Sequence, residues 1–395
     1  MANALARLPK PPPNEVRPEA KEGIAALPLE ARQTEHGWLF ARDVLHAAEH
    51  RHGQVPVAGA LDVRPEHLAQ LALDPALEAV RLDRMLLLDL ETTGLSGGTG
   101  TYPIVVGLAF FEGRRLLVRQ FFLRRPGEEG PMLRELAERV SAASCLVTFN
   151  GKSFDWPLVR NRFVMNRLRA PVPPPHLDLL HCSRRVFRWR GGGTRLSEIE
   201  EQVIGHRRVG DVDGAFIPEL YFRYLRDGRA ARLLPVLDHN VQDVLLLAAL
   251  IAELASAYAD PEREADARDR FGLAVSAFRA GDEERALKFA RLASAGLEGA
   301  LRGEALALEG KLLSRSGAHR DAAKALRAAL ECAEGDRLQA IHLELAKLCE
   351  HRLRDLPSAL AHARAASGYE GAEAAKRIAR LERRIAITAP LLGER

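Results

Sequence analysis

The chain of 395 residues is 47% hydrophobic and 28% charged, which is typical of folded globular domains and excludes a chain disordered throughout. No apolar run approaches the roughly 20 residues of a membrane span, and the N-terminus lacks the apolar core of a secretory signal. Four scattered cysteines argue against a disulfide framework or a zinc ribbon, and a net charge of +4 permits a polyanionic partner without requiring one. We therefore expect a cytoplasmic protein of two or three domains, with no membrane partner.

Residues 1–83 are expected to form an N-terminal arm and a small mixed region. The first 30 or so are rich in Pro and Ala and predict a loose arm. Helical patterns follow around Ala41–His50 and Pro65–Leu73. The motif HAAEH, His46–His50, matches the HxxEH pattern of one zinc-protease class, but short patterns occur by chance and no downstream glutamate ligand stands out. We interpret it as a polar helix face, with a catalytic zinc as the alternative.

The stretch Met85–Gly94 reads MLLLDLETTG and predicts a short buried strand that ends in two acids. Because side chains alternate along a strand, Asp89 and Glu91 should point to the same face. Two carboxylates are costly to bury without a partner, and a hard divalent cation prefers oxygen ligands. This strand therefore predicts one half of a metal site.

The next block alternates strands and helices. Strands are predicted at Ile104–Phe111, Arg115–Leu123 and Cys145–Phe149, with helices over Pro131–Ala142 and from about Asp155. Further helices are expected at Leu177–Phe187, Leu196–Val203, Pro218–Leu225 and Leu233–Ala257. This order predicts an α/β sheet with helices packed on it.

Two more acids extend the metal hypothesis. Pro157 favours a helix start, which places Asp155 near a helix N-terminus; an ordinary N-cap is the alternative. Asp243 lies on an apolar helix with His239 one turn earlier on the same face, where a surface ion pair is the alternative. Four acids that each follow or interrupt an apolar segment in one domain favour a carboxylate metal site.

Residues 262–395 change in character: they are rich in Ala, Leu, Arg and Glu, and they repeat. Ala286, Ala322 and Ala359 align at spacings close to the roughly 34-residue period of tetratricopeptide helix pairs. Small residues at fixed positions let paired helices pack closely. We expect an all-α, tetratricopeptide-like domain that could bind a protein partner.

The quoted motifs DLETTG, FNGKSFD and HNVQD resemble the three successive motifs of the DEDD 3′–5′ exonucleases, which have a ribonuclease-H-like fold. The surrounding text, including GGTGTYPIVVG and HLDLLHCSRR, is similar to the YprB-like branch of that superfamily. The resemblance covers about Arg84 to Leu254. It implies an α/β ribonuclease-H-like domain at residues 84–258, with a mixed sheet flanked by helices.

The resemblance implies hydrolysis of phosphodiester bonds with two Mg²⁺ or Mn²⁺ ions. The implied metal ligands are Asp89, Glu91, Asp155 and Asp243. The residues implied for substrate binding are Thr92, Thr93, Gly94, Leu95, Asn150 and Phe154; for the first four a simple turn after the strand is the alternative.

One position departs from the family pattern. Familiar branches carry a histidine five residues before the last aspartate or a tyrosine four before it. Here Asp238 stands five before and His239 stands four before. His239 could orient or deprotonate a water, so we expect a catalytic role for it. Asp178, Asp211 and Asp213 are interpreted as caps or loop residues, with a supporting role at the metal site as the alternative.

Two stretches mix arginines with aromatic residues, at residues 160–169 and 184–195, and suit single-stranded nucleic acid. Arginine dominates the basic residues throughout, so a solvated helix face is the alternative. The leading hypothesis is a nuclease acting on single-stranded DNA or RNA ends. The second hypothesis is a nucleic-acid-binding scaffold whose repeat tail binds a protein.

Overall fold

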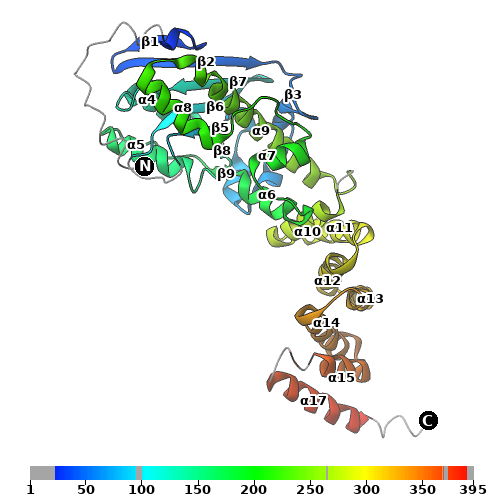
Figure 1. The fold of residues 1–395 in the computed structure, drawn as a ribbon. Coiled ribbons are helices and arrows are strands. Elements are labelled where there is room, and N and C mark those ends of the chain that lie inside the picture. The colour runs from blue at the N-terminus through cyan, green and yellow to red at the C-terminus, as the bar shows by residue number, and fades with distance from the viewer. Residues whose placement is uncertain (1–22, 95–99, 264–265, 367, 369–371, 389–395) are drawn as a thin grey trace. The chain divides into compact units, whose positions relative to one another are not determined.

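The computed structural model describes residues 23–94, 100–263, 266–366, 368 and 372–388 (Figure 1). Most of the predicted N-terminal arm, residues 1–22, lies outside this range. The chain forms two compact units: residues 1–184 with 192–259, and residues 185–191 with 260–395. All strands found in the described residues belong to the first unit.

A seven-stranded mixed sheet forms the first unit, in the order β1-β2-β7-β6-β5-β8-β9. The central strand β5 pairs antiparallel with β6 and parallel with β8, and β8 pairs parallel with β9. The strands are β1 (Glu30–Thr34), β2 (Gly37–His46), β5 (Met85–Thr92), β6 (Pro103–Glu112), β7 (Arg115–Phe122), β8 (Cys145–Thr148) and β9 (His176–Asp178). A separate hairpin pairs β3 (Arg51–His52) with β4 (Val55–Pro56).

Helices cover both faces of this sheet (Figure 1). On one face, Leu86, Leu88 and Leu90 of β5 pack with apolar residues of α4 (Gly130–Ala142) and α5 (Asp155–Met165). The long helix α9 (Leu234–Ala259) contacts β5 from the other side. The remaining helices of the unit are α3 (Pro65–Ala72), α6 (Leu179–Phe187), α7 (Leu196–Ile199) and α8 (Ile217–Asp227). Because β5 is covered on both faces, its apolar residues form a continuous run.

Helix α9 is the core helix of the first unit. The segment Ala230–Ala259 is the one described helix that is long and apolar enough to cross a membrane by length and composition, and 72% of its most apolar window is buried. Val244, Leu246 and Leu250 are fully buried. This burial is what a core helix of a folded domain requires, since its apolar residues face protein on most sides.

Two predicted helices differ from the observed elements. The segment Ala41–His50 is not helical: Ala41–His46 belongs to β2, where seven consecutive residues pair with β7. Cross-strand partners far along the chain therefore override the local helical spacing. Leu177 and Asp178 end β9 and the helix α6 begins only at Leu179, because pairing with β8 extends through Asp178.

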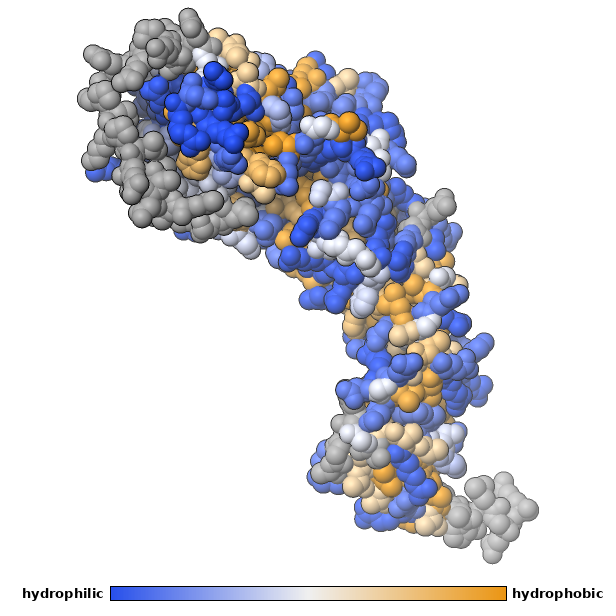
Figure 2. Space-filling view, viewed as in Figure 1, coloured by the Kyte–Doolittle hydropathy of each residue, from blue (hydrophilic) through white to orange (hydrophobic). Residues whose placement is uncertain are grey.

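The second unit consists of helices in the described residues. They are α10 (Ala267–Ala280), α11 (Glu283–Gly296), α12 (Gly299–Arg315), α13 (His319–Leu330), α14 (Gly335–Leu348), α15 (Leu356–Ala365) and α17 (Ala372–Thr388). Ala286, Ala322 and Ala359 lie in α11, α13 and α15, and each is fully buried. Figure 2 shows small hydrophobic patches between hydrophilic side chains on the visible face of these helices. The repeat in the sequence thus corresponds to a buried small residue in every second helix.

Candidate active site

Asp89 and Glu91 lie on the face of β5 that α9 covers, as the alternation along the strand predicts. Asn240 of α9 donates from Nδ2 to Asp89 Oδ2 over 2.8 Å. The Glu91 side chain is buried, and its Oε1 atom has no hydrogen-bond partner among the described residues. A buried carboxylate oxygen without a partner is costly, so this position calls for a cation or another donor.

A row of three residues crosses the sheet beneath Asn240. Asp89 on β5 pairs with Gly107 on β6, which pairs with Gln120 on β7. Gln120 Nε2 donates to Asn240 Oδ1 over 2.9 Å and to the Leu237 carbonyl over 2.7 Å. A Cβ atom on Gly107 would stand 2.0 Å from Asn240 Oδ1. Gly107 therefore leaves the space through which Asn240 reaches Asp89.

The substitution Gly107→Ala is expected to displace Asn240 and destabilise the protein by roughly 1–3 kcal/mol, through overpacking and lost hydrogen bonds. Urea unfolding would measure the change. Gly214→Ala is the matched control, because an added Cβ there meets nothing within 4 Å. Adding Asn240→Ala to Gly107→Ala should cost less than the two single effects combined, since the clash is then removed. Equal stability of the Gly107→Ala and Gly214→Ala variants would contradict this account.

Asp155 occupies the first turn of α5, beside the other acids. It is buried, and its charge raises the pKa of both Asp89 and Glu91. The preceding loop is held by Asp178 at the end of β9, which accepts backbone N–H bonds from Asn150 at 2.8 Å and from Lys152 at 3.1 Å. Asp178 Oδ1 also accepts from Leu180 N at 3.1 Å and so caps α6. Asp178 thus fixes the loop that carries Asp155.

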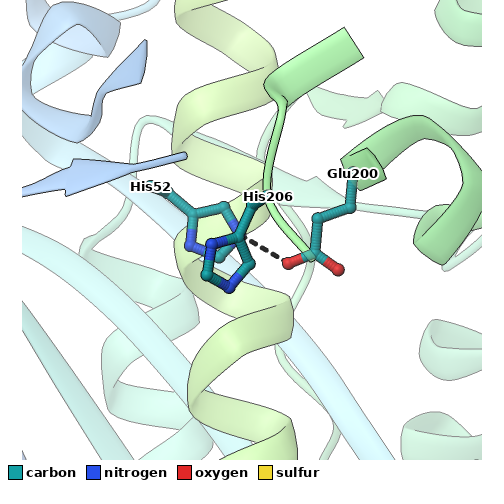
Figure 3. Close-up of side chains that lie close together, drawn as sticks. All are labelled: His52, Glu200 and His206. Atoms are coloured by element: carbon teal, nitrogen blue, oxygen red, sulfur yellow. Dashed lines mark hydrogen bonds and ion pairs between the residues drawn. The ribbon is translucent and has the colours of Figure 1, made fainter. Parts of the chain in front are cut away.

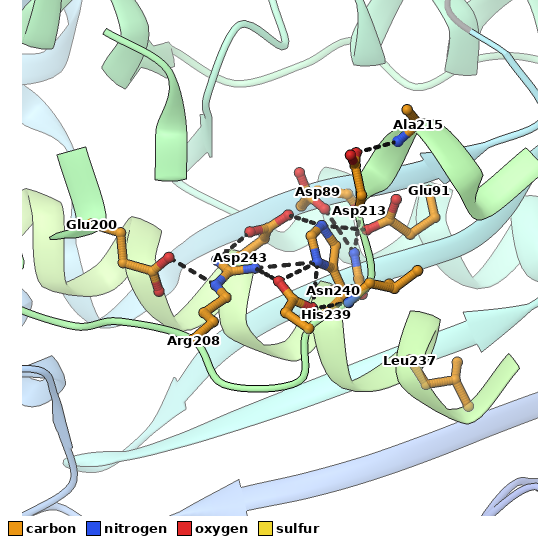
Figure 4. Close-up of polar contacts among 12 residues, drawn as sticks. Asp89, Glu91, Glu200, Arg208, Asp213, Ala215, Leu237, His239, Asn240 and Asp243 are labelled. Carbon is orange, nitrogen blue, oxygen red and sulfur yellow. Dashed lines mark hydrogen bonds and ion pairs between the residues drawn. The ribbon is translucent and has the colours of Figure 1, made fainter. Parts of the chain in front are cut away.

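Asp243 and His239 face the strand acids from α9 (Figure 4). His239 Nε2 lies 3.4 Å from Asp243 Oδ2 and 3.9 Å from Glu91 Oε1. On the other side of the ring, Nδ1 lies 2.8 Å from both oxygens of Asp211. The Asp211 carboxylate can only accept, so this contact suits an N–H at Nδ1, although Arg208 Nη1 also lies 3.3 Å from Nδ1. Nε2 is the ring nitrogen that points toward Asp243 and Glu91.

Asp238, the residue five before Asp243, does not take part. Its side chain is 55% exposed and pairs with Arg42 of β2 at 2.8 Å. The Asp213 side chain accepts only from the backbone N–H of Ala215 in the same loop, at 2.9 Å, among the contacts described for it. The acid that contacts His239 Nδ1 is Asp211, which no motif in the sequence distinguishes from its neighbours.

Arg208 is the cation that the sequence does not reveal. Its Nη2 donates to Asp243 Oδ1 over 2.6 Å, its Nε to Glu200 Oε2 over 2.7 Å, and its Nη1 to Asp211 Oδ2 over 3.1 Å (Figure 4). Burial disfavours the charge, but Asp243 and Glu200 raise the pKa of Arg208 above its ordinary range. Arg208 therefore stays charged and holds Asp243 in place.

The single positive charge of Arg208 does not neutralise the negative charges of the surrounding carboxylates. Burial, together with Asp243 and Asp155, raises the pKa of Asp89 well above its ordinary value, and burial together with Asp89 does the same for Glu91. Burial and Asp178 raise the pKa of Asp155 to about 7. Glu91, His239 and Asp243 each offer a ligand atom within 4.8 Å of one another. Oxygen donors and excess negative charge fit a hard divalent metal ion.

The residues predicted for substrate binding border the acids. Thr92 Oγ1 donates to the Gly94 carbonyl over 3.0 Å, and Thr93 Oγ1 accepts from Tyr102 N over 2.9 Å, so both hydroxyls shape the turn after β5. Asn150 has a left-handed backbone with φ 68°, and Phe154 precedes α5. Leu95 lies outside the described residues.

Some side chains of the two arginine- and aromatic-rich stretches, residues 160–169 and 184–195, make contacts inside the protein. Arg162 is buried, pairs with Glu129 and stacks 4.1 Å from the Tyr102 ring. In the second unit, Arg190 Nε donates to Asp269 Oδ1 over 2.8 Å, and Trp189 lies 5.4 Å from the Phe271 ring. These side chains therefore make contacts within the fold.

Comparison with known proteins supports the fold of the first unit. Residues 86–255 match the RNase H superfamily model. The chain is 33% identical over 224 residues to a protein named "Uncharacterized protein YprB" from Bacillus subtilis (strain 168), an alignment that covers 56% of this chain and 54% of that one. The chain thus spans about half the length of this curated relative. The predicted ribonuclease-H-like fold with an all-helical C-terminal region is confirmed.

Proposed function

We propose that residues 84–258 form a divalent-metal-dependent nuclease that hydrolyses phosphodiester bonds, acting as a 3′–5′ exonuclease on single-stranded ends. The observation that carries this proposal is the gathering of four carboxylates from β5, α5 and α9, three of them with raised pKa values. The match of this region to the RNase H superfamily supports it.

The proposed ligands are carboxylates that repel one another, and two of them, Glu91 and Asp155, are buried: they are Asp89, Glu91, Asp155 and Asp243. When bound, two Mg²⁺ or Mn²⁺ ions would activate the attacking water and stabilise the leaving oxygen. The protein supplies the placement of the oxygen atoms: Asn240 orients Asp89, Asp178 fixes the loop of Asp155, and Arg208 holds Asp243. Such pre-positioning removes the need to reorganise the site during the reaction.

We assign proton transfer to His239. Asp211 holds the proton on Nδ1, so Nε2 faces Glu91 and Asp243 and can accept the proton of the attacking water. The imidazolium formed in this way would be stabilised by Asp211 at 2.8 Å. In this proposal Asp211 orients His239, and His239 acts as the general base on the side of β5 where the metal ligands lie.

Substrate contacts are proposed for the residues that border the acids. Thr92 ends β5, Thr93 and Gly94 follow it, and Asn150 and Phe154 flank the loop before Asp155. The same role is proposed for Leu95, which lies outside the described residues. The helical second unit, with its repeated buried alanines, is proposed to be tetratricopeptide-like and to bind a protein partner.

The proposal predicts that the full chain with Mg²⁺ or Mn²⁺ shortens single strands stepwise from the 3′ end, and that EDTA stops the reaction. A panel of DNA and RNA strands labelled at the 5′ end, single and double, would show a ladder of shorter products. A 3′-terminal phosphorothioate provides the matched control and should slow the first step. Internal cuts would indicate an endonuclease. Binding without cleavage, equally tight with and without metal, would favour the scaffold hypothesis.

A further inference from the structure

We propose that His52, Glu200 and His206 form a second metal site, selective for a divalent transition-metal ion such as Zn²⁺ and distinct from the carboxylate site. Each residue offers a ligand atom, and these atoms lie within 4.8 Å of one another (Figure 3). His52 and Glu200 are both 2% exposed. Two imidazoles and one carboxylate are the ligand set of zinc sites that keep one position open.

The backbone brings these three residues together from distant segments. His52 lies in the hairpin β3–β4, Glu200 begins a π-helical turn (Glu200–Ile204), and His206 follows that turn. Gln54 N donates to the Ile204 carbonyl over 2.9 Å, and a Cβ on Gly53 would meet the same oxygen at 2.3 Å. The close contact of hairpin and turn fixes the ligands before any ion binds, which lowers the entropy cost of binding.

Further imidazoles surround the site. His46 and His50 have ring centroids 4.4 Å apart, as do His52 and His206. His46 Nε2 is buried and has no hydrogen-bond partner within the described ranges. Imidazole nitrogen suits zinc and other transition metals, whereas the oxygen-rich site at Asp89 suits magnesium or manganese. The two sites therefore differ in the class of metal they select.

Metal binding would replace an existing contact. His52 Nε2 and Glu200 Oε1 lie 2.6 Å apart, within hydrogen-bond distance. Two ligands of a tetrahedral zinc, each 2.0–2.1 Å from the ion, stand roughly 3.3 Å apart, so the side chains must separate by less than about 1 Å. The hydrogen bond between His52 and Glu200 is lost on binding, because each ligand atom then turns a lone pair toward the ion.

Glu200 connects the proposed site to the acids. While Oε1 faces His52, the other oxygen, Oε2, accepts from Arg208 Nε over 2.7 Å. Arg208 in turn donates to Asp243 over 2.6 Å. An ion bound to Glu200 would therefore hold the carboxylate, and with it Arg208, in the position that orients Asp243.

Titration of the EDTA-treated full chain with Zn²⁺ by calorimetry, and with Co²⁺ by visible absorption, tests the site. We expect His206→Gln to weaken binding of both ions at least 10-fold and to remove the Zn²⁺-dependent rise in Tm. His181→Gln, at an exposed histidine of α6, is the matched control and should bind as the wild type does. Asp89→Asn should retain this binding, which separates it from the carboxylate site.

The His206→Gln variant must unfold at the wild-type Tm in EDTA, so that weaker binding reflects the lost ligand and not a damaged fold. Glu200→Gln gives a second test, because it removes the carboxylate ligand from the opposite side of the site. Wild-type protein that binds neither ion, or His206→Gln and Glu200→Gln variants that bind both as tightly as wild type, would overturn the proposal. These results do not depend on whether the chain cleaves nucleic acid.

Discussion

Asp89→Asn is expected to abolish metal-dependent cleavage. Burial, together with the negative charges of Asp243 and Asp155, raises the pKa of Asp89. Asn keeps the size of the side chain and can still accept a hydrogen bond from Asn240, so the fold should persist. Loss of a group that only supports a metal ligand costs roughly 10–100-fold in activity or affinity. Loss of a ligand should therefore exceed 100-fold in the rate of product formation.

Comparison with His239→Gln separates metal binding from proton transfer. A general base contributes roughly 10²–10⁴-fold to rate, so this variant should also be slow. Calorimetric titration with Mn²⁺ should show normal binding for His239→Gln and weakened binding for Asp89→Asn. Asp213→Asn, an exposed acid of the loop that carries Asp211, is the control and should keep full activity. Wild-type rates for Asp89→Asn would refute the assignment of the acids.

The metal-free protein is expected to lose stability as pH rises from about 4 through about 7. The pKa of Asp155 is 3.8 in an ordinary setting and about 7 in the fold, mainly because the carboxyl is buried. A group that binds its proton more tightly when folded favours folding at low pH, and this contribution disappears as pH rises through the folded-state pKa. A shift of this size corresponds to at most about 4 kcal/mol. Asp89 and Glu91, whose pKa values are also raised, extend the loss toward higher pH.

Thermal unfolding in EDTA across pH 4–9 measures this dependence. Addition of Mg²⁺ or Mn²⁺ should restore the Tm most strongly at high pH, where the carboxyls are deprotonated and bind the ion. Asp155→Asn should raise the Tm of the metal-free protein above pH 7 while it removes activity, because the neutral amide avoids a buried charge. A Tm in EDTA that changes equally with pH in wild type and Asp155→Asn would rule out this cause.

Arg208 is the half-buried cation that contacts the acids of the proposed site. The arginine sits in a loop after the π-helical turn and contacts Asp243, Glu200 and Asp211, which come from three places in the chain. It offsets part of the negative charge and fixes the last acid, but four carboxylates remain too many for one guanidinium. The loop of Arg208 therefore fixes Asp243, but negative charge remains at the acids, and a metal ion would be needed to neutralise it.

The sequence by itself determined the elements whose patterns are local. The apolar run before Asp89 specifies a buried strand, and alternation places Asp89 and Glu91 on one face, as observed for β5. Pro157 marks the start of α5, and the apolar spacing from residue 233 predicts α9 to within a few residues. These features follow from backbone geometry and burial within one segment, so no distant partner is needed to read them.

Only the tertiary structure decided which distant groups meet. Local spacing favoured a helix at Ala41–His50, but pairing with β7 made Ala41–His46 a strand, and the histidines of HAAEH came to lie beside His52. The acids and their partners, Asp89 with Asn240 and Asp243 with Arg208, stand 151 and 35 residues apart in the chain. Hydrogen bonds and ion pairs of this kind depend on packing in three dimensions, which leaves no periodic signal in the sequence.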